Sequence, residues 1–502
     1  MKKTIIILSA FVLLIGNSCK KDFLSVNEKN PNSASEVTAK LILPAALGAS
    51  AAIINNPDRF NFVYLWHGLW SISGGYSQPN DLTQYNIRNS SYEGNWTEFY
   101  VNGGNYNYIE NSCYTDIKEK TVNPLKVNYL AIAKIMKAWI FHNLVDAYGN
   151  VPYTDAFQAP DVLKPKYDPQ QAIYEDLVVK LDEAISQLNS ASVDAENPGA
   201  NDVMFAGDMS KWVVFANTLK LRILMHQSDW EGRSGYIAEK IATTIGEGFI
   251  GAGESALVNP GYSQSTGKMN PFYANFYAAD ATTVADGIKY TMAGLDGIDF
   301  YNSNSDERLG YFYSTYDGST YGGNYFGDLV ENLASAAETS ELGVGMVGTY
   351  DRSAVILSDF ESLFLQAEAA QKGIIAGSAK VFYEQAVTQS FKYFGIHDTI
   401  ITHYLEQENT SVNFDQAPNK IELIMTQKWA ALNGISPMEI WTDYRRSGYP
   451  NFIHFAQDVN RKNDTPPVRL LYPQRELDLN GDVVAGEGTI NLFSSKIFWQ
   501  SR

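Results

Sequence analysis

The strongest constraint on the fold is a run of apolar residues with helical spacing near residue 130. From Leu125 to Tyr148, apolar residues recur at steps of three and four, which places them on one face of a helix. Gly149 and then Pro152 follow, and both residue types end helices. The sequence therefore predicts an amphipathic helix over 125–148 that must bury one face against another part of the chain.

A second predicted helix supplies the partner for this face. From Pro169 to Leu188, apolar side chains again fall largely on one face, and Asp168 stands before the first turn as a candidate N-cap. The two helices are therefore expected to form a helical hairpin.

The same design returns later in the chain. Residues 360–372 form a predicted helix that ends at Gly373, and a partner helix begins at Ala379. Small alanines stand where the two helices would cross, and an aromatic residue follows one helical turn later. This arrangement resembles tetratricopeptide helix pairs, whose unit is about 34 residues. Further helices are expected over 210–226, 236–245 and 419–432. We expect an all-α fold in which tetratricopeptide-like pairs form a scaffold for long irregular ligand-binding loops.

The N-terminus has the pattern of a bacterial lipoprotein signal. Two lysines precede an apolar run from Thr4 to Ile15, and small residues lead to Cys19. This run is too short to span a bilayer, which needs about twenty apolar residues. We interpret residues 1–18 as a signal peptide and Cys19 as the lipidated mature N-terminus. An ordinary signal peptide followed by a coincidental cysteine is the alternative.

The mature chain is interpreted as a polar tether, residues 19–32, followed by a single domain, residues 33–502. The chain has only two cysteines, so once Cys19 carries lipid, Cys113 has no partner for an intramolecular disulfide. Stability must come from a large packed core. The formal net charge of −18 disfavours binding to nucleic acid or to anionic lipid headgroups, so the lipid is the expected link to the membrane.

Two regions, about 64–110 and 254–350, lack helical periodicity and are rich in aromatic, Asn, Gly and Ser residues. Residues 260–350 alone hold eleven of the 31 tyrosines. Long loops on a rigid frame are often binding loops. A flat aromatic ring covers the C–H face of a sugar while Asn and Asp bind its hydroxyls, although peptides can use the same surface.

The candidate ligand residues are therefore chosen from these loops by composition. The aromatic ones are expected to act as stacking platforms, and Asn80 and Asp81 as partners for hydroxyls. The set is Trp66, Trp70, Tyr76, Asn80, Asp81, Tyr85, Tyr273, Tyr311, Tyr313 and Tyr316. The alternative for any single aromatic residue is that it fills loop packing with its polar tip in water.

No motif for catalysis or for a cofactor stands in a convincing context. Two Gly-x-Gly-x-x-Gly matches, at 246–251 and 343–348, follow no convincing strand and are interpreted as loop glycines. The six histidines form no His-Glu-x-x-His pattern, and neither Cys-x-x-Cys nor Gly-x-Ser-x-Gly occurs. Asp478-x-Asn480-x-Asp482 is only a partial calcium pattern, because the glycine is at the fourth place instead of the sixth and the twelfth residue is Thr489 instead of Glu, so no metal is predicted. A glycoside hydrolase stays open, since it needs only two carboxylates, but no barrel-like alternation of strands and helices is present to carry them.

Several motifs, in order along the chain, resemble the SusD/RagB family of surface nutrient-binding lipoproteins of Bacteroidetes. The segments are LVDAYGNVPY (144–153), WVVFANTLKLRILM (212–225), FLQAEAAQKG (364–373), EIWTDYRRSGYP (439–450) and RLLYPQRELDLN (469–480).

This resemblance implies a non-enzymatic outer-membrane lipoprotein that faces the cell exterior. It also implies a SusC-like TonB-dependent transporter as partner, to which an oligosaccharide, or in some members a peptide, is passed. The motifs themselves are interpreted as scaffold. Arg445 and Arg446, for example, are expected to pair with a carboxylate or stack on an aromatic ring at the end of a helix.

Overall fold

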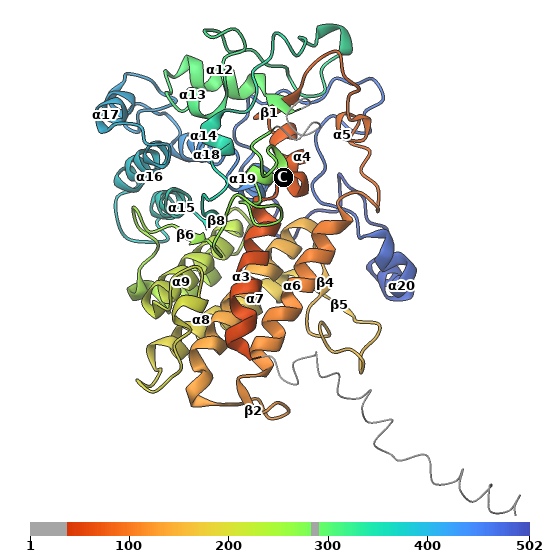
Figure 1. The fold of residues 1–502 in the computed structure, drawn as a ribbon, viewed down its shortest axis with the longest axis vertical. Coiled ribbons are helices and arrows are strands. Elements are labelled where there is room, and N and C mark those ends of the chain that lie inside the picture. Colours follow the sequence, from red (N-terminus) through yellow and green to blue (C-terminus); the bar gives the residue numbers. More distant parts are fainter. Residues whose placement is uncertain (1–37, 283–290, 502) are drawn as a thin grey trace, which may run out of the picture.

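A stack of helices fills the lower half of the molecule in Figure 1, a computed structural model that describes residues 38–282 and 291–501. Each helix of this stack packs against the next. Its members are α3 (Ala39–Asn55), α6 (Glu93–Asn111), α7 (Val127–Tyr148), α8 (Gln170–Asn189) and α9 (Met209–His226).

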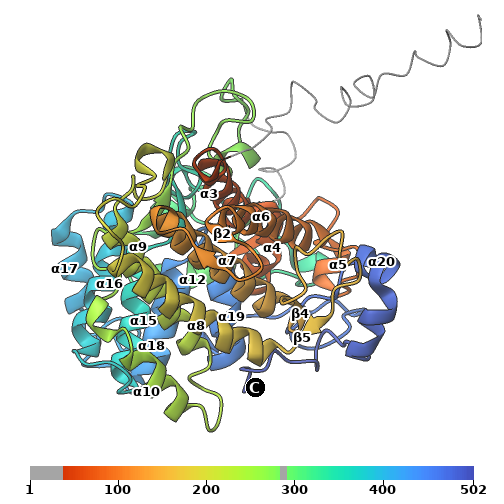
Figure 2. The ribbon, with the colours of Figure 1, turned by 90° about the horizontal axis from the view of Figure 1, so that it is seen from below.

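A second group of helices continues the scaffold, since α9 also packs against α15. Within this group α15 contacts α16 and α18, and α19 contacts α4, α7, α9 and α18. The view from below in Figure 2 shows α15, α16, α17 and α18 gathered on one side of the stack. The group comprises α15 (Asp359–Gln371), α16 (Ala379–Tyr393), α17 (Asp398–Glu406), α18 (Lys420–Ala431) and α19 (Pro437–Ser447).

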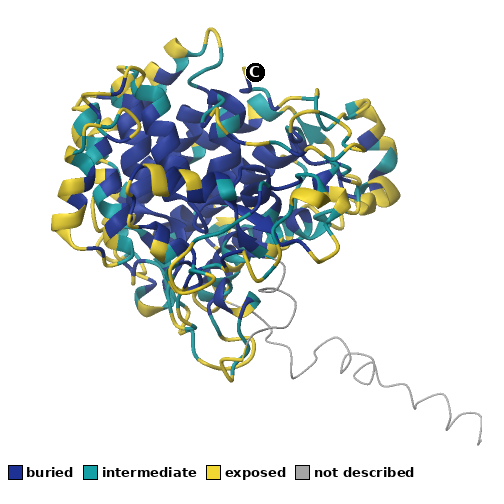
Figure 3. Cartoon of the chain, turned by 90° about the horizontal axis from the view of Figure 1, so that it is seen from above, coloured by how far each residue is buried: buried dark blue, intermediate teal, exposed yellow. Residues whose placement is uncertain are grey.

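The remaining helices are short or peripheral. They are α4 (Pro57–Trp66), α5 (Asn80–Thr83), α10 (Ser234–Ala242), α12 (Leu295–Ser303), α13 (Leu309–Phe312), α14 (Val344–Val347) and α20 (Gln474–Val484). Figure 3 shows that the buried residues concentrate in the central helices, whereas α20 and the outer loops are largely exposed.

Strands occur in the described residues only as small two-stranded antiparallel sheets. The pairs are β1 (Trp70–Ile72) with β7 (Thr291–Ala293), β2 (Tyr114–Asp116) with β3 (Thr121–Val122), β4 (Val151–Pro152) with β5 (Tyr167–Asp168), and β6 (Ala256–Val258) with β8 (Ala354–Leu357). In the first pair Trp70 lies opposite Ala293, which ties the two aromatic-rich loop regions together.

The prediction of an all-α scaffold of helix pairs is confirmed. The pairs α7–α8 and α15–α16 occupy the predicted segments, and α9, α10 and α18 match the other predicted ranges with ends shifted by a few residues. One detail differs, because Asp168 does not cap α8. Its Oδ2 instead accepts hydrogen bonds from the backbone N–H groups of Tyr153 and Thr154, at 3.0 and 2.8 Å.

The first predicted loop region is shorter than expected, because α6 occupies its second half. Gly103 and Gly104 lie inside this helix, although glycine disfavours helices. The phenyl ring of Phe157 packs directly over Gly103, where a Cβ atom would come within 2.6 Å of the ring. Tertiary packing therefore overrides local propensity here.

The signal peptide, Cys19 and the tether lie outside the described residues. Within them, Ala39–Trp66, which carries α3 and α4, is the one helical segment long and apolar enough to cross a membrane. A core helix passes the same test, and α3 packs against α6 and β8 inside the protein.

Buried ion pairs hold the helices of the second group together. Arg446 at the end of α19 binds Glu368 of α15 and Asp443, with closest N···O distances of 2.6 Å to each. Arg445 lies over the ring of Trp441, with its guanidinium carbon 3.9 Å from the ring centroid. The structural role predicted for both arginines is confirmed.

A second part of this network joins α7, α9 and α19. His226 Nδ1 lies 3.3 Å from Asp146, and its Nε2 lies 3.0 Å from Glu439. Burial alone would lower the pKa of His226, but the charges of Glu439 and Asp146 raise it to about 9. The histidine therefore contributes as a cation. Arg222 adds a contact with Glu439 at 3.4 Å and an ion pair with Glu361.

Glu368→Gln tests the importance of the network. Burial raises the pKa of Glu368, but Arg446 and Lys372 outweigh that effect and hold the pKa below its usual value, so the carboxylate is charged. We expect the substitution to lower the free energy of unfolding by about 3–5 kcal/mol, because it leaves a buried guanidinium without its main partner. Urea denaturation measures the change.

Glu384→Gln is the matched control. Glu384 lies 3.7 Å from Lys380 on the surface of α16, so its loss should change stability by no more than about 0.5 kcal/mol. Equal effects of the two substitutions would contradict the assigned role of the network.

Candidate ligand-binding site

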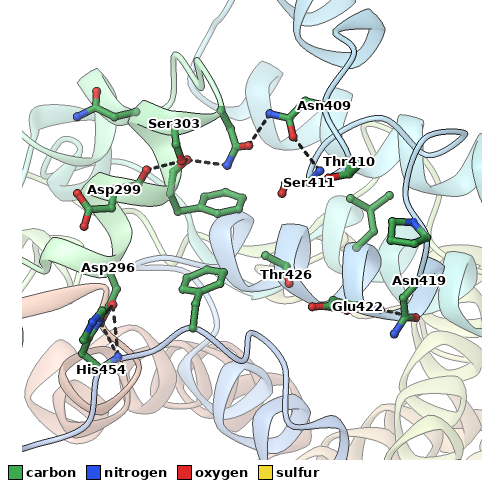
Figure 4. A pocket seen from close by; sticks show the side chains of 16 residues that line it. Asp296, Asp299, Ser303, Asn409, Thr410, Ser411, Asn419, Glu422, Thr426 and His454 are labelled. Atoms are coloured by element: carbon green, nitrogen blue, oxygen red, sulfur yellow. Dashed lines mark hydrogen bonds and ion pairs between the residues drawn. The ribbon is translucent and has the colours of Figure 1, made fainter.

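A cavity of about 960 Å³ opens between α12, the α17–α18 connection, α18 and the segment after α19. Its size suits a small-molecule ligand. Figure 4 shows the polar side chains around the opening, with Asp296 and His454 at one side and Asn419 and Glu422 at the other.

An exposed aromatic ring forms one wall of the cavity. Phe452 is 40% exposed and stacks on buried Phe300, with centroids 6.0 Å apart and an angle of 12° between the rings. Trp429 packs edge-on against both rings from the protein interior, at 5.5 and 5.6 Å. The Phe452 ring is therefore held from behind, while part of its surface stays accessible to a ligand.

Amide and hydroxyl groups line the opposite wall. The side chain of Asn409 donates to Asn304 Oδ1 at 2.8 Å, and Asn304 donates to the Phe300 carbonyl at 2.7 Å. Asn419 caps α18 through the N–H of Glu422 and also donates to the Tyr449 hydroxyl at 3.0 Å. These contacts fix the amides in place before any ligand arrives.

The rim carries an aspartate–histidine pair. Asp296, in the first turn of α12, binds His454 Nδ1 at 2.6 Å through Oδ1 and the His454 backbone N–H at 3.2 Å through Oδ2. The Asp296 carboxyl can lie against the backbone of residue 68 because that residue is glycine. A Cβ atom there would overlap the carboxyl, and the backbone of Gly68 has a φ of +70°.

Tyr325 completes this rim. Its ring lies on the His454 ring with centroids 3.8 Å apart, and its hydroxyl donates to Asp299 Oδ2 at 3.1 Å.

Burial raises the pKa of Asp296 to about 6, although the hydrogen bonds from His454 act in the opposite direction.

The cavity has an acidic lining. Three carboxylates, those of Asp296, Asp299 and Glu422, face it, whereas the described lining residues include no lysine or arginine. A ligand that carries negative charge would be repelled, so the lining favours a neutral or cationic one.

None of the ten residues predicted from sequence lines this cavity. Four of them are core residues, so their assignment as stacking platforms is corrected. Trp66, Trp70, Tyr85 and Tyr313 are at most 1% exposed. The polar tip of each is hydrogen-bonded inside the protein, as the indole of Trp70 is to Asn433 at 3.0 Å and the hydroxyl of Tyr313 is to the Leu69 carbonyl at 2.6 Å.

The other predicted residues differ in accessibility. Tyr273 is also buried, at 8% exposed, and stacks on Tyr277, so its assignment as a stacking platform is corrected as well. The ring of Tyr311 packs against Phe394. Exposed side chains are those of Tyr76, Asn80, Asp81 and Tyr316. Whether these four contact a ligand stays a prediction.

Sequence reasoning missed Phe452, His454, Asn419 and Asp299. The segment YPNFIHF, residues 449–455, directly follows the end of α19 and combines aromatic rings with Asn and His. That composition is the signal used for the other loops. The segment is only seven residues long and overlaps the motif EIWTDYRRSGYP (439–450), which is interpreted as scaffold.

Comparison with known proteins identifies relatives over most of the chain. Residues 31–473 match the SusD-like family described as "Starch-binding associating with outer membrane". No curated protein matches the sequence.

Solved structures share the fold over nearly their full length. A chitin-binding protein is 24% identical, with a TM-score of 0.73, and the match covers 92% of this chain and 99% of that one. A SusD-like protein from Bacteroides thetaiotaomicron is 23% identical, with a TM-score of 0.74 and the same coverage. A chitin-binding SusD homologue from Flavobacterium johnsoniae is 20% identical, with a TM-score of 0.72 and coverage of 91% and 98%.

Asp296→Asn tests the electrostatics of the rim. Because the native pKa of Asp296, about 6, lies above the ordinary value of 3.8, the native state binds the proton more tightly than the unfolded chain. The protonated Asp296 carboxyl therefore adds to the free energy of unfolding. This stabilisation is fully present below the ordinary pKa and is lost as the pH rises through the native pKa. Asparagine still offers an acceptor to His454 but does not titrate.

We therefore expect wild type to lose about 2 kcal/mol of unfolding free energy relative to the variant between about pH 4 and pH 7. Urea denaturation at several pH values measures the difference. Parallel stability curves for the two proteins would contradict the raised pKa.

Proposed function

Because this chain belongs to the SusD-like family, we propose that it is a cell-surface binding protein that captures an oligosaccharide and passes it to a partner TonB-dependent outer-membrane transporter. The family's description as starch-binding and associated with the outer membrane supports the cargo class and the location. The resemblance of the sequence motifs supports the partner.

The observation that carries the proposal is the accessible Phe452 ring in a cavity walled by amides and hydroxyls. A sugar ring presents a C–H face to an aromatic ring and its hydroxyls to polar groups. Phe300 and Trp429 hold the Phe452 ring in place, so little conformational entropy is lost when a sugar stacks on it.

The polar wall is suited to hydroxyl recognition. Asn409 and Asn419 each already use part of their hydrogen-bonding capacity within the protein, which fixes their orientation and leaves other donors and acceptors for the ligand. The carboxylates of Asp299 and Glu422 accept hydrogen bonds from hydroxyls, and together with Asp296 they disfavour acidic sugars. We therefore propose a neutral oligosaccharide as the cargo of this pocket.

Binding without catalysis is proposed. A glycosidase needs one carboxyl to protonate the leaving group and a second to attack or to activate water. Asp296 has a raised pKa, but His454 occupies both of its oxygens, one through the ring and one through the backbone N–H. Asp296 is therefore engaged in positioning the segment that carries Phe452.

The anchoring and the transfer step complete the proposal. A lipid on Cys19 would hold the protein at the outer membrane, on the exterior face, and the tether of residues 19–32 would let it lie over the transporter. Purification of a tagged form from its native membrane tests this step. Recovery of a TonB-dependent transporter with the tagged form supports the partner, and its absence counts against it.

Phe452→Ala tests the site. We expect it to weaken binding of neutral oligosaccharides at least about tenfold, because the stacking surface is lost while the exposed position leaves the fold intact. Titration calorimetry with malto- and chito-oligosaccharides measures the affinity, and chromatography of the mixtures detects any breakdown.

Tyr108→Ala is the matched control, since Tyr108 is an aromatic residue of α6 that is 45% exposed and does not line the cavity. Its affinity should equal that of wild type. Breakdown of the glycan would move the protein to the hydrolases. If the protein binds mixed peptides and no sugars, the proposed cargo changes from oligosaccharide to peptide, and the family assignment is unaffected.

If wild type binds and Phe452→Ala does so equally well, the ligand site lies elsewhere. The exposed tyrosines Tyr76 and Tyr316 are then the residues to replace.

A further inference from the structure

A second cavity, of about 630 Å³, lies between α6, α7 and α8, under the loop of residues 153–158. The turn between β2 and β3 forms its remaining edge through Lys120. In Figure 1, α12 and α17 lie toward the upper end of the molecule, whereas β2 lies at the lower end, so this cavity is remote from the acidic pocket.

The charge of this cavity is opposite to that of the protein as a whole. Its lining holds four lysines, Lys120, Lys134, Lys137 and Lys180, but only two carboxylates, those of Glu110 and Asp176. The chain carries a formal net charge of −18, so a cavity with an excess of lysines stands apart from its surroundings.

Three of these lysines are held by ion pairs. Lys134 and Lys180 bind Glu183 of α8 at 2.8 and 3.2 Å, and Lys137 binds Glu110 at 2.8 Å. Among the described residues, Lys120 has no carboxylate within 4.0 Å. Lys120 is exposed, so its ammonium group is available to a ligand that enters the cavity.

The cavity also has an apolar side built around Phe157. This residue has a φ of +64°, a conformation that costs energy for a bulky side chain. Its ring packs over Gly103 of α6 on one side, and Lys137 Nζ lies 5.8 Å from the ring centroid. The strained backbone thus holds an aromatic ring beside the lysines.

We propose that this cavity is a second binding site, which takes a saccharide bearing a carboxylate, such as a uronic acid. The carboxylate binds at the lysine wall, with Lys120 supplying the charge that no protein group neutralises. The C–H face of the sugar ring lies against Phe157.

The size and lining of the cavity favour a sugar acid over a small inorganic anion. A volume of about 630 Å³ far exceeds the space that a sulfate ion occupies, and much of the surface is apolar. The side chains of Asn107, Asn111 and Gln158 supply amides for hydroxyl groups. An ion alone would leave these amides and the Phe157 ring unused.

Electrostatics keeps the two ligands apart. The carboxylates of the first pocket repel an acidic sugar, whereas the lysines of the second attract it over a distance of about one Debye length. The inference goes beyond the proposed function, because it concerns a different cavity and a different class of glycan.

Titration of the purified mature protein with trigalacturonate tests this site. We expect saturable binding that weakens about tenfold in Lys120→Glu and in Phe157→Ala, and that weakens as NaCl rises from about 50 to 500 mM. Phe452→Ala should leave this binding unchanged. Galactotriose, which has the same length but no carboxylate, should not compete.

Lys118→Glu is the matched control, because Lys118 is exposed in the same β2–β3 turn, carries the same charge and does not line the cavity. It should bind trigalacturonate as wild type does. The proposal is overturned if trigalacturonate does not bind, if Lys118→Glu weakens binding as much as Lys120→Glu, or if Phe452→Ala abolishes binding. Displacement of trigalacturonate by an equal concentration of sulfate would also overturn it, in favour of a simple anion site.

Discussion

Charged side chains buried between α7, α9, α15, α18 and α19 set the relative positions of the two helix groups, because Arg222 and His226 of α9 pair with Glu439 of α19. A buried charge is costly unless it is paired, so each member can occupy its place only when its partner on another helix does the same. Lys428 of α18 shows this constraint, since it lies 3.1 Å from Glu439 and 2.8 Å from Asp443 on α19. Because α18 also lines the acidic pocket, the network that fixes the scaffold also fixes one wall of the proposed binding site.

The two cavities illustrate how one scaffold can present opposite charges. The first is formed where α12, α18 and the segment after α19 meet, and its carboxylates include none of the buried network. The second is formed by α6, α7 and α8, where lysines of α7 and α8 pair with Glu110 of α6 and Glu183 of α8. In both, an aromatic ring is supported from behind by packing, by Phe300 and Trp429 for Phe452 and by Gly103 for Phe157.

Much of the scaffold could be predicted from the sequence, because an amphipathic helix must repeat its apolar residues at about 3.6-residue intervals wherever it packs. The pairs α7–α8 and α15–α16 have this pattern. In contrast, α6 has glycine and asparagine where apolar residues would be expected, since its buried face accommodates Phe157 at Gly103 and a hydrogen bond from Asn102 to the Ala46 carbonyl at 3.1 Å. These contacts are with distant parts of the chain, so no local sequence pattern predicts them.

The binding residues could not be chosen from sequence, because composition does not say which side of a loop faces water. Trp70 and Tyr313 share the chemistry of a sugar platform, yet both direct their polar tips to buried partners. Phe452 is less typical of such a platform but reaches the surface, because Phe300 and Trp429 fill the space behind it. The sequence by itself determined the family and the helical scaffold, through periodicity and ordered motifs. Only the tertiary structure decided which aromatic rings are accessible, since accessibility depends on segments that are far apart in the chain.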